Sequence, residues 1–82
     1  MKIIKRDGRA VDYNREKIQI AIEKANKEVR PKERASKDDI KNIIKYIEEL
    51  GKKRMLVEDI QDIIEEKLMQ IQKYELAKKY IV

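Results

Sequence analysis

Apolar residues recur three and four positions apart through most of this chain, which is the spacing of one face of an α-helix. The pattern predicts a helix from about Arg15 to Val29, a second from Ser36 to Leu50, and further helical structure after Glu58. The residues expected to face the core are Ile18, Ala21, Ile22, Ala25 and Val29, then Ile40, Ile43, Ile44, Ile47 and Leu50, then Ile60, Ile63, Ile64, Leu68 and Ile71. The third stripe continues through Tyr74, Ala77 and Ile81, so periodicity alone allows either one long helix or a bent pair.

Residues that favour helix ends flank these stripes. Asn14 and Ser36 are good N-cap residues, and Gly51 stands where a helix can end with a left-handed residue. Pro31 disfavours helical geometry in the residue before it, and the charged segment 30–35 has no apolar face. This segment is therefore predicted to be a loop.

The first thirteen residues follow a different pattern. Two short runs flank Asp7-Gly8, a pair favoured in two-residue hairpin turns because glycine tolerates a positive φ. We expect strands from about Ile3 to Arg6 and from Arg9 to Tyr13, and a third strand at Met55–Val57, a run too short for a helix. The predicted fold class is α+β: a four-helix bundle capped by a small three-stranded sheet with an N-terminal β-hairpin.

The side chains present exclude most catalytic and metal sites. In 82 residues, enough for one domain, there is no His, Cys, Trp or Phe, and Ser36 is the one serine. A Ser-His-Asp triad, a thiol nucleophile, a zinc ribbon and a disulfide framework are thus ruled out. The net charge of +5 favours anionic partners only weakly. Without a membrane-length apolar stretch or a secretory signal, the chain is expected to be cytoplasmic.

Several segments, taken in order, resemble a known family. They are Ile3-Ile4-Lys5-Arg6-Asp7-Gly8-Arg9, Tyr13-Asn14, Lys17-Ile18, Ala21-Ile22, Lys24-Ala25, the segment Asp59-Ile60-Gln61-Asp62-Ile63-Ile64-Glu65, Leu68-Met69, Ala77-Lys78 and Tyr80-Ile81. Together they resemble the ATP cone, the nucleotide-binding regulatory module of ribonucleotide reductases and of their bacterial transcriptional repressor.

The resemblance implies an allosteric function. In the family, ATP or dATP binds between the sheet and the helix ends, and the bound nucleotide controls the activity of a ribonucleotide reductase through the oligomer it forms. The ligand is expected to carry Mg²⁺ on its phosphates, and the partners are the rest of the reductase polypeptide and other subunits. The domain itself has no catalytic group. The resemblance also implies a break between the third and fourth helices.

The parent protein follows from the same resemblance. The family's usual continuation is missing after Val82, so residues 1–82 are expected to be one domain of a longer protein. The repressor carries a Cys-rich zinc ribbon ahead of its cone, which makes the N-terminal cone of a reductase large subunit the better fit. The opening MKIIKRDGR favours the anaerobic class.

Four basic residues and one N-cap are candidates for the phosphate end of the site. Lys5 and Arg6 match the family's leading basic pair, and Lys17 lies in the first turn of a helix, where free N–H groups already favour anions. Arg9 either adds positive potential or is an exposed turn residue. Asn14 is first of all an N-cap.

The apolar end of the site is expected to hold the adenine. Its candidate wall is Ile3, Val11, Ile18 and Ile22, of which Ile22 fits the core better. Tyr13 can lie beside the base or cover the bundle with its hydroxyl in water. Some family members carry an acidic residue on the second strand and a Thr near the start of the third helix, where this chain has Val11 and Val57. Gln61 is the nearest polar substitute for these contacts.

Two other classes of function compete with this interpretation. One is a small basic domain that binds nucleic acid, suggested by the cluster Lys52-Lys53-Arg54, and the other is a bundle that binds only proteins. The predicted helices have no basic recognition face and the predicted sheet has no stacked aromatic residues, so nucleic acid is the weaker alternative.

Overall fold

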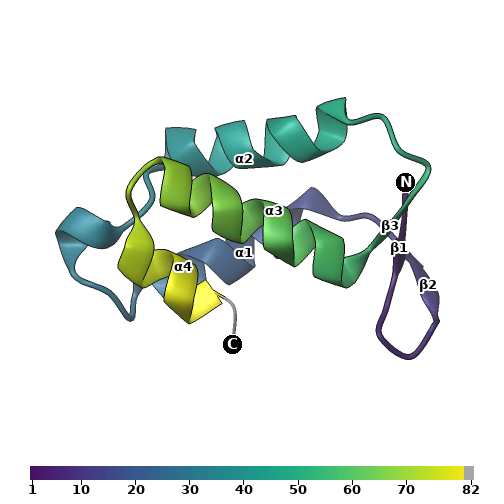
Figure 1. Ribbon diagram of the computed structural model, residues 1–82, viewed down its shortest axis with the longest axis horizontal. Helices are drawn as coiled ribbons and strands as arrows, with labels where there is room; N and C mark the ends of the chain where they lie inside the picture. The colour runs from purple at the N-terminus through teal and green to yellow at the C-terminus, as the bar shows by residue number, and fades with distance from the viewer. Residues whose placement is uncertain (81–82) are drawn as a thin grey trace.

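The computed structural model describes residues 1–80 and confirms the predicted α+β class (Figure 1). The elements are β1 (Lys2–Ile4), β2 (Ala10–Asp12), α1 (Arg15–Asn26), the 3-10 helix η1 (Pro31–Glu33), α2 (Lys37–Glu49), β3 (Arg54–Leu56), α3 (Val57–Gln70) and α4 (Tyr74–Tyr80). The sheet lies at one end of the molecule and η1 at the other, with the helices between them (Figure 1). Ile81, placed on the last apolar stripe, lies outside the described residues.

The sheet has the order β2-β1-β3, with β1 antiparallel to β2 and parallel to β3. Ile3 lies opposite Val11 on one side and Met55 on the other, and these three side chains form the row that faces the helices. The two hairpin strands are shorter than predicted, with three residues each. Strand β3 has the predicted length but begins one residue earlier, so Val57 begins α3 rather than ending β3.

The hairpin loop differs from the predicted two-residue turn. The Gly8 N–H donates to the Lys5 carbonyl at 2.9 Å and the Lys5 N–H donates to the Arg9 carbonyl at 2.8 Å, so the loop contains three residues. Gly8 has a φ of +88°, whereas Asp7 is not left-handed, and a two-residue type I′ turn would require positive φ at both central positions. The Asp7 carboxylate instead accepts from the backbone N–H and the Nε of Arg9, at 3.1 and 2.7 Å.

The charged segment 30–35 is more ordered than predicted. It forms η1, and Ala35 is buried because the Asn26 side chain pairs with its backbone in both directions, at 3.0 and 2.9 Å. Helix α1 therefore ends at Asn26, three residues before the predicted end, although Val29 still contributes to the core. The sequence of this segment shows no apolar face, but its backbone at Ala35 forms hydrogen bonds with the Asn26 side chain.

The start and end of α2 agree with the sequence. Ser36 Oγ accepts from the Asp39 N–H at 3.0 Å while Asp39 Oδ2 accepts from the Ser36 N–H at 2.9 Å, a reciprocal capping box. Gly51 follows the helix with a φ of +65°. Leu50, expected on the buried stripe, is 37% exposed because the last turn of the helix extends beyond the core.

A left-handed residue separates α3 from α4, so the break implied by the family resemblance is confirmed. Gln72 has a φ of 63°, and the Lys73 and Gln72 N–H groups donate to the carbonyls of Leu68 and Met69, at 2.8 and 2.9 Å. This is the Schellman pattern of helix termination. Ile71 sits in this turn and is 39% exposed, so its predicted burial is wrong.

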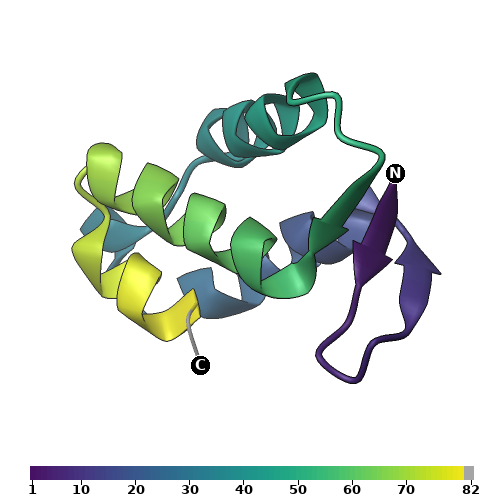
Figure 2. The same cartoon turned by 45° about the vertical axis from the view of Figure 1, so that its right-hand side comes forward.

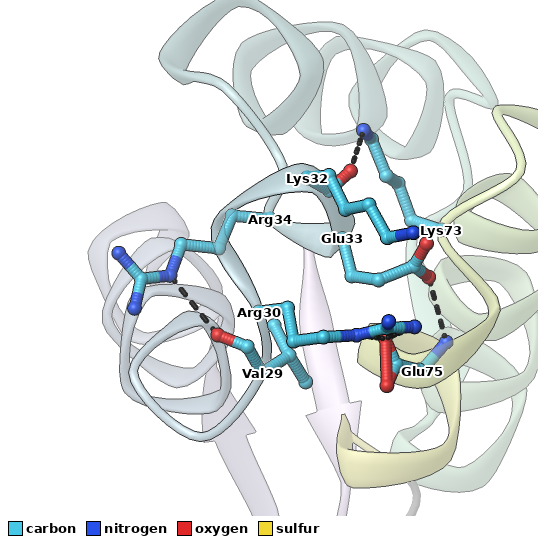
Figure 3. Close-up of polar contacts among 7 residues, drawn as sticks. All are labelled: Val29, Arg30, Lys32, Glu33, Arg34, Lys73 and Glu75. Carbon is cyan, nitrogen blue, oxygen red and sulfur yellow. Dashed lines mark hydrogen bonds and ion pairs between the residues drawn. The ribbon is translucent and has the colours of Figure 1, made fainter.

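Charged residues of η1 hold the start of α4 (Figure 3). Glu33 accepts from the Glu75 N–H at 3.2 Å, which caps the helix from a distant segment, and Arg30 donates to the Glu75 carboxylate at 3.1 and 2.9 Å. Lys73 Nζ donates to the Lys32 carbonyl at 2.8 Å. These contacts fold α4 back toward the sheet end (Figure 2).

The core of the described residues is entirely apolar and comes from all four helices. Its fully buried side chains are Ile22, Ile47, Ile64, Leu68 and Leu76. Helix α1 packs against α2 and α4, and α3 packs against the same two helices. Between residues 1 and 80, no helix has the length and apolar character needed to cross a membrane.

Candidate functional site

A pocket of about 270 Å³ opens where the sheet meets the starts of α1 and α3. Its lining comes from β1, β2, both of these helices and the end of α4. The lining residues are Ile3, Lys5, Val11, Asp12, Tyr13, Asn14, Lys17, Ile18, Ala21, Val57, Ile60, Gln61 and Tyr80. Nine of the twelve residues proposed from the sequence therefore lie around one hollow, although they are up to 58 positions apart (Ile3 to Gln61).

Two helices begin at this pocket. Asn14 caps α1, since its Oδ1 accepts from the Glu16 N–H at 3.0 Å, and the role predicted for it as an N-cap is confirmed. Helix α3 starts at Val57 with no side-chain cap. The positive ends of two helix dipoles thus add to the potential at one place, which favours an anion there.

Two lysines reach the same pocket from different elements. Lys5 follows β1 and is partly buried, whereas Lys17 lies in the first turn of α1 and is exposed. Neither ammonium group has a carboxylate partner among residues 1–80. The one carboxylate in the lining, Asp12, is already paired across the sheet with Lys2, whose hydrogen bond lowers the pKa of Asp12. The pocket therefore presents uncompensated positive charge.

The opposite part of the lining is apolar. Ile3, Ile18 and Ile60 are buried, Val11 and Val57 are partly buried, and all five contribute to the wall. An apolar wall next to a few placed polar groups is the usual arrangement of a small-molecule site.

The structure adds four residues to the lining that sequence reasoning missed: Asp12, Ala21, Ile60 and Tyr80. Ala21 and Ile60 follow Lys17 and Val57 at helical spacing, so the period of each helix could have indicated them. Tyr80 comes from the far end of the described residues, and its one signal in the sequence is the segment Tyr80-Ile81, which resembles the family. Burial raises the pKa of Tyr80 to about 12.

The Tyr13 hydroxyl is not in water, which corrects one of the two interpretations given to it. The side chain contributes to the pocket lining, and its hydroxyl donates to Glu48 Oε2 at 2.7 Å. Arg15 donates to both oxygens of the same carboxylate, at 3.0 and 2.6 Å. These hydrogen bonds lower the pKa of Glu48, while burial and the contact with Glu48 raise the pKa of Tyr13. The pocket wall is thereby fixed to the last turn of α2.

Three proposed residues lie outside the lining. Arg9 is paired with Asp7 in the hairpin loop, and Ile22 is fully buried in the core. Arg6 stands next to the pocket, where its Nη2 donates to Gln61 Oε1 at 3.2 Å.

Other hollows in the described residues are chemically different. A groove of about 550 Å³ between α2 and α3 mixes basic and acidic side chains, Lys52 and Arg54 with Asp59 and Asp62. A hollow of about 530 Å³ along α3 contains only acidic charges, among them Glu65 and Glu66. Neither combines an apolar wall with unpaired lysines.

A hollow of about 260 Å³ between α1 and α2 does place Lys37 and Lys41 beside Ile40 and Ile44, but it also holds the carboxylate of Glu23. The pocket at the sheet, where two helices begin and the one carboxylate is already paired with a lysine, is therefore the best candidate for an anionic ligand.

Comparison with known proteins gives a family match and a curated relative. A family model described as the ATP cone domain matches residues 1–82. The chain is also 32% identical over 93 residues to the ribonucleoside-diphosphate reductase subunit alpha of Chlamydia trachomatis serovar D, an alignment that covers all of this chain and 9% of that protein. The chain thus spans less than a tenth of the length of this curated relative. Since the family model matches from the hairpin to the last helix, the chain belongs to the ATP-cone family.

Proposed function

We propose that this domain binds ATP or dATP in the pocket between the sheet and the starts of α1 and α3. The observation that carries the proposal is the meeting of two unpaired lysines, Lys5 and Lys17, with an apolar wall at two helix N-termini. The lysines contact the phosphates, and Ile3, Val11, Ile18 and Val57 form the side of the pocket that takes the adenine.

Binding here serves allosteric regulation of a ribonucleotide reductase. The family match and the reductase relative support this role, and the ligand's identity then controls the activity and the oligomeric state of the parent enzyme. The partners are the rest of the reductase polypeptide and its other subunits, in the cytoplasm. The opening residues favour an anaerobic reductase as the parent.

The residues present suit magnesium carried by the ligand rather than by the protein. No cluster of three or more acidic side chains that could hold a metal ion occurs between residues 1 and 80. Magnesium prefers oxygen ligands and often binds through substrate phosphates, so it enters with the nucleotide and offsets part of its charge.

Calorimetric titration and thermal melting of the chain with MgATP and MgdATP test the proposal. A ligand at a hundred times its dissociation constant stabilises a fold by about 2.7 kcal/mol, which gives a measurable rise in melting temperature. If millimolar ATP and dATP both leave the melting temperature and the titration heat unchanged, the proposal fails. Salt-sensitive retention on DNA with no nucleotide effect would instead favour the nucleic-acid alternative.

A further inference from the structure

Arg6 joins the hairpin loop to the first turns of α3 beside the pocket. Its Nη2 donates to Gln61 Oε1 at 3.2 Å, and its Nε lies 3.5 Å from Glu58 Oε1. Glu58 and Gln61 are three residues apart on α3 and share one face of the helix. Gln61 lines the pocket, whereas Glu58 and Arg6 do not. The guanidinium is therefore held at the edge of the pocket by a carboxylate.

The Glu58 carboxylate and a phosphate bound in the pocket would compete for the Arg6 guanidinium. Arg6 donates to Gln61, which lines the same pocket as Lys5, so the guanidinium stands beside the place proposed for the phosphates. A guanidinium binds phosphate through parallel hydrogen bonds, but here its Nε already faces a carboxylate. Both side chains of the ion pair are largely exposed, at 69% and 57%, so the pair is weak enough to exchange.

We propose that Glu58 restrains Arg6 in the free domain and releases it when a nucleotide polyphosphate binds, so that Glu58 lowers the affinity of the site. The inference rests on the proposed nucleotide-binding function and adds a residue that tunes it. Glu58 contacts no ligand in this account and acts through Arg6.

Replacement of Glu58 by glutamine tests the inference. Glu58→Gln is expected to tighten MgATP binding about two- to fivefold, the range set by breaking one exposed ion pair. The gain should be smaller for AMP and absent for adenosine, because these ligands offer Arg6 fewer phosphate oxygens or none.

Asp59→Asn is the matched control. It removes the same charge from the same turn of α3, but Asp59 lines the groove on the α2 side and does not contact Arg6. Its affinity for MgATP should stay within about 1.5-fold of the unsubstituted chain, since exposed charges without direct contact are largely screened. Melting temperatures of both variants, measured without ligand, establish that the fold is retained.

A double-mutant cycle with Arg6→Gln isolates the contact. In the Arg6→Gln background, Glu58→Gln should no longer tighten binding, because the competition it relieves is gone. Equal gains from Glu58→Gln and Asp59→Asn, or a gain that persists without Arg6, would overturn the inference while leaving nucleotide binding in place. Unchanged affinity in Glu58→Gln would do the same, whereas a chain that binds no nucleotide would overturn the proposed function itself.

Discussion

At the scale of single residues, the proposed site is tested by replacing the two lysines that line the pocket. Lys5→Ala and Lys17→Ala should each weaken ATP binding about tenfold or more with little loss of stability, because charge-assisted contacts contribute roughly 1.5–3 kcal/mol. Arg54→Ala should leave the affinity within about twofold, since Arg54 lines the α2–α3 groove instead. Titration calorimetry of the three variants gives the comparison.

The alternative outcome is informative. If the chain attracts nucleotides through general basicity, all three substitutions will weaken binding alike, and high salt will erase the losses. Titrations of the three variants at two salt concentrations therefore distinguish direct contacts in a specific site from long-range attraction by the net positive charge.

Glu48 gives the domain an acid-sensitive contact. Its pKa is lowered below the ordinary 4.5 by the hydrogen bonds from Arg15 and Tyr13, so the unfolded state binds more protons below that pH. The stability that Glu48 contributes is therefore present above about pH 4.5 and is lost as the pH falls. Glu48→Gln should make the free energy of unfolding lower at pH 7 and less dependent on pH below 4.5.

Urea unfolding between pH 7 and pH 3 measures this effect. Glu49→Gln is the control, because it removes the same charge from the neighbouring position, which forms no ion pair within residues 1–80. An identical acid response in both variants would show that Glu48 has no special role.

The resemblance to a family predicted the lining of the pocket better than its contacts. Lys5 was proposed because it matches the family's leading basic pair, and Lys17 because it matches the family and lies at a helix start. The partner of Tyr13 is 35 positions away and that of Arg6 is 55, so no local pattern indicates either. Pairing between side chains so far apart in the chain depends on how the helices pack, and a single sequence does not reveal that packing.

At the scale of elements, the turn between α3 and α4 contains a strained residue, Gln72, and a substitution can relieve the strain. Gln72 adopts a left-handed conformation that costs a residue with a Cβ about 1–2 kcal/mol, whereas glycine adopts it freely. Gln72→Gly should therefore raise the free energy of unfolding by about 0.5–1 kcal/mol after the extra entropy of unfolded glycine is subtracted. For a domain of this size the melting temperature should rise by about 2–8 °C.

Gln70→Gly is the control and should lower the free energy of unfolding. It makes the same change two residues earlier, at the last residue of α3, where glycine costs up to about 1 kcal/mol relative to a helix former. If both variants are destabilised, the left-handed turn is not the feature that limits stability.

Periodicity predicted where helices exist and failed where they end. The stripe running through Ile71 and Tyr74 is continuous in sequence, and only the backbone at Gln72 interrupts it. Likewise, the segment 30–35 was expected to be a loop because it has no apolar face, yet Glu33 caps α4 and Arg30 pairs with Glu75. Helix ends fixed by distant residues are not encoded in the local period.

At the scale of the whole molecule, the domain should bind nucleotide without hydrolysing it. Hydrolysis needs a group that orients the attacking water, and the one carboxylate in the pocket lining, Asp12, is paired with Lys2. Purified protein should release no phosphate from ATP above background in a coupled assay. Steady release that disappears in Asp12→Asn would contradict this expectation.

The central place of β1 in the sheet has a consequence for biosynthesis. Strand β1 gains its parallel neighbour only when residues 54–56 have been translated, and the same pocket receives Tyr80 later still. Such pairing between distant segments forms slowly and late. If the pocket is the nucleotide site, a nascent chain should therefore bind its ligand only after nearly all of the domain has been translated.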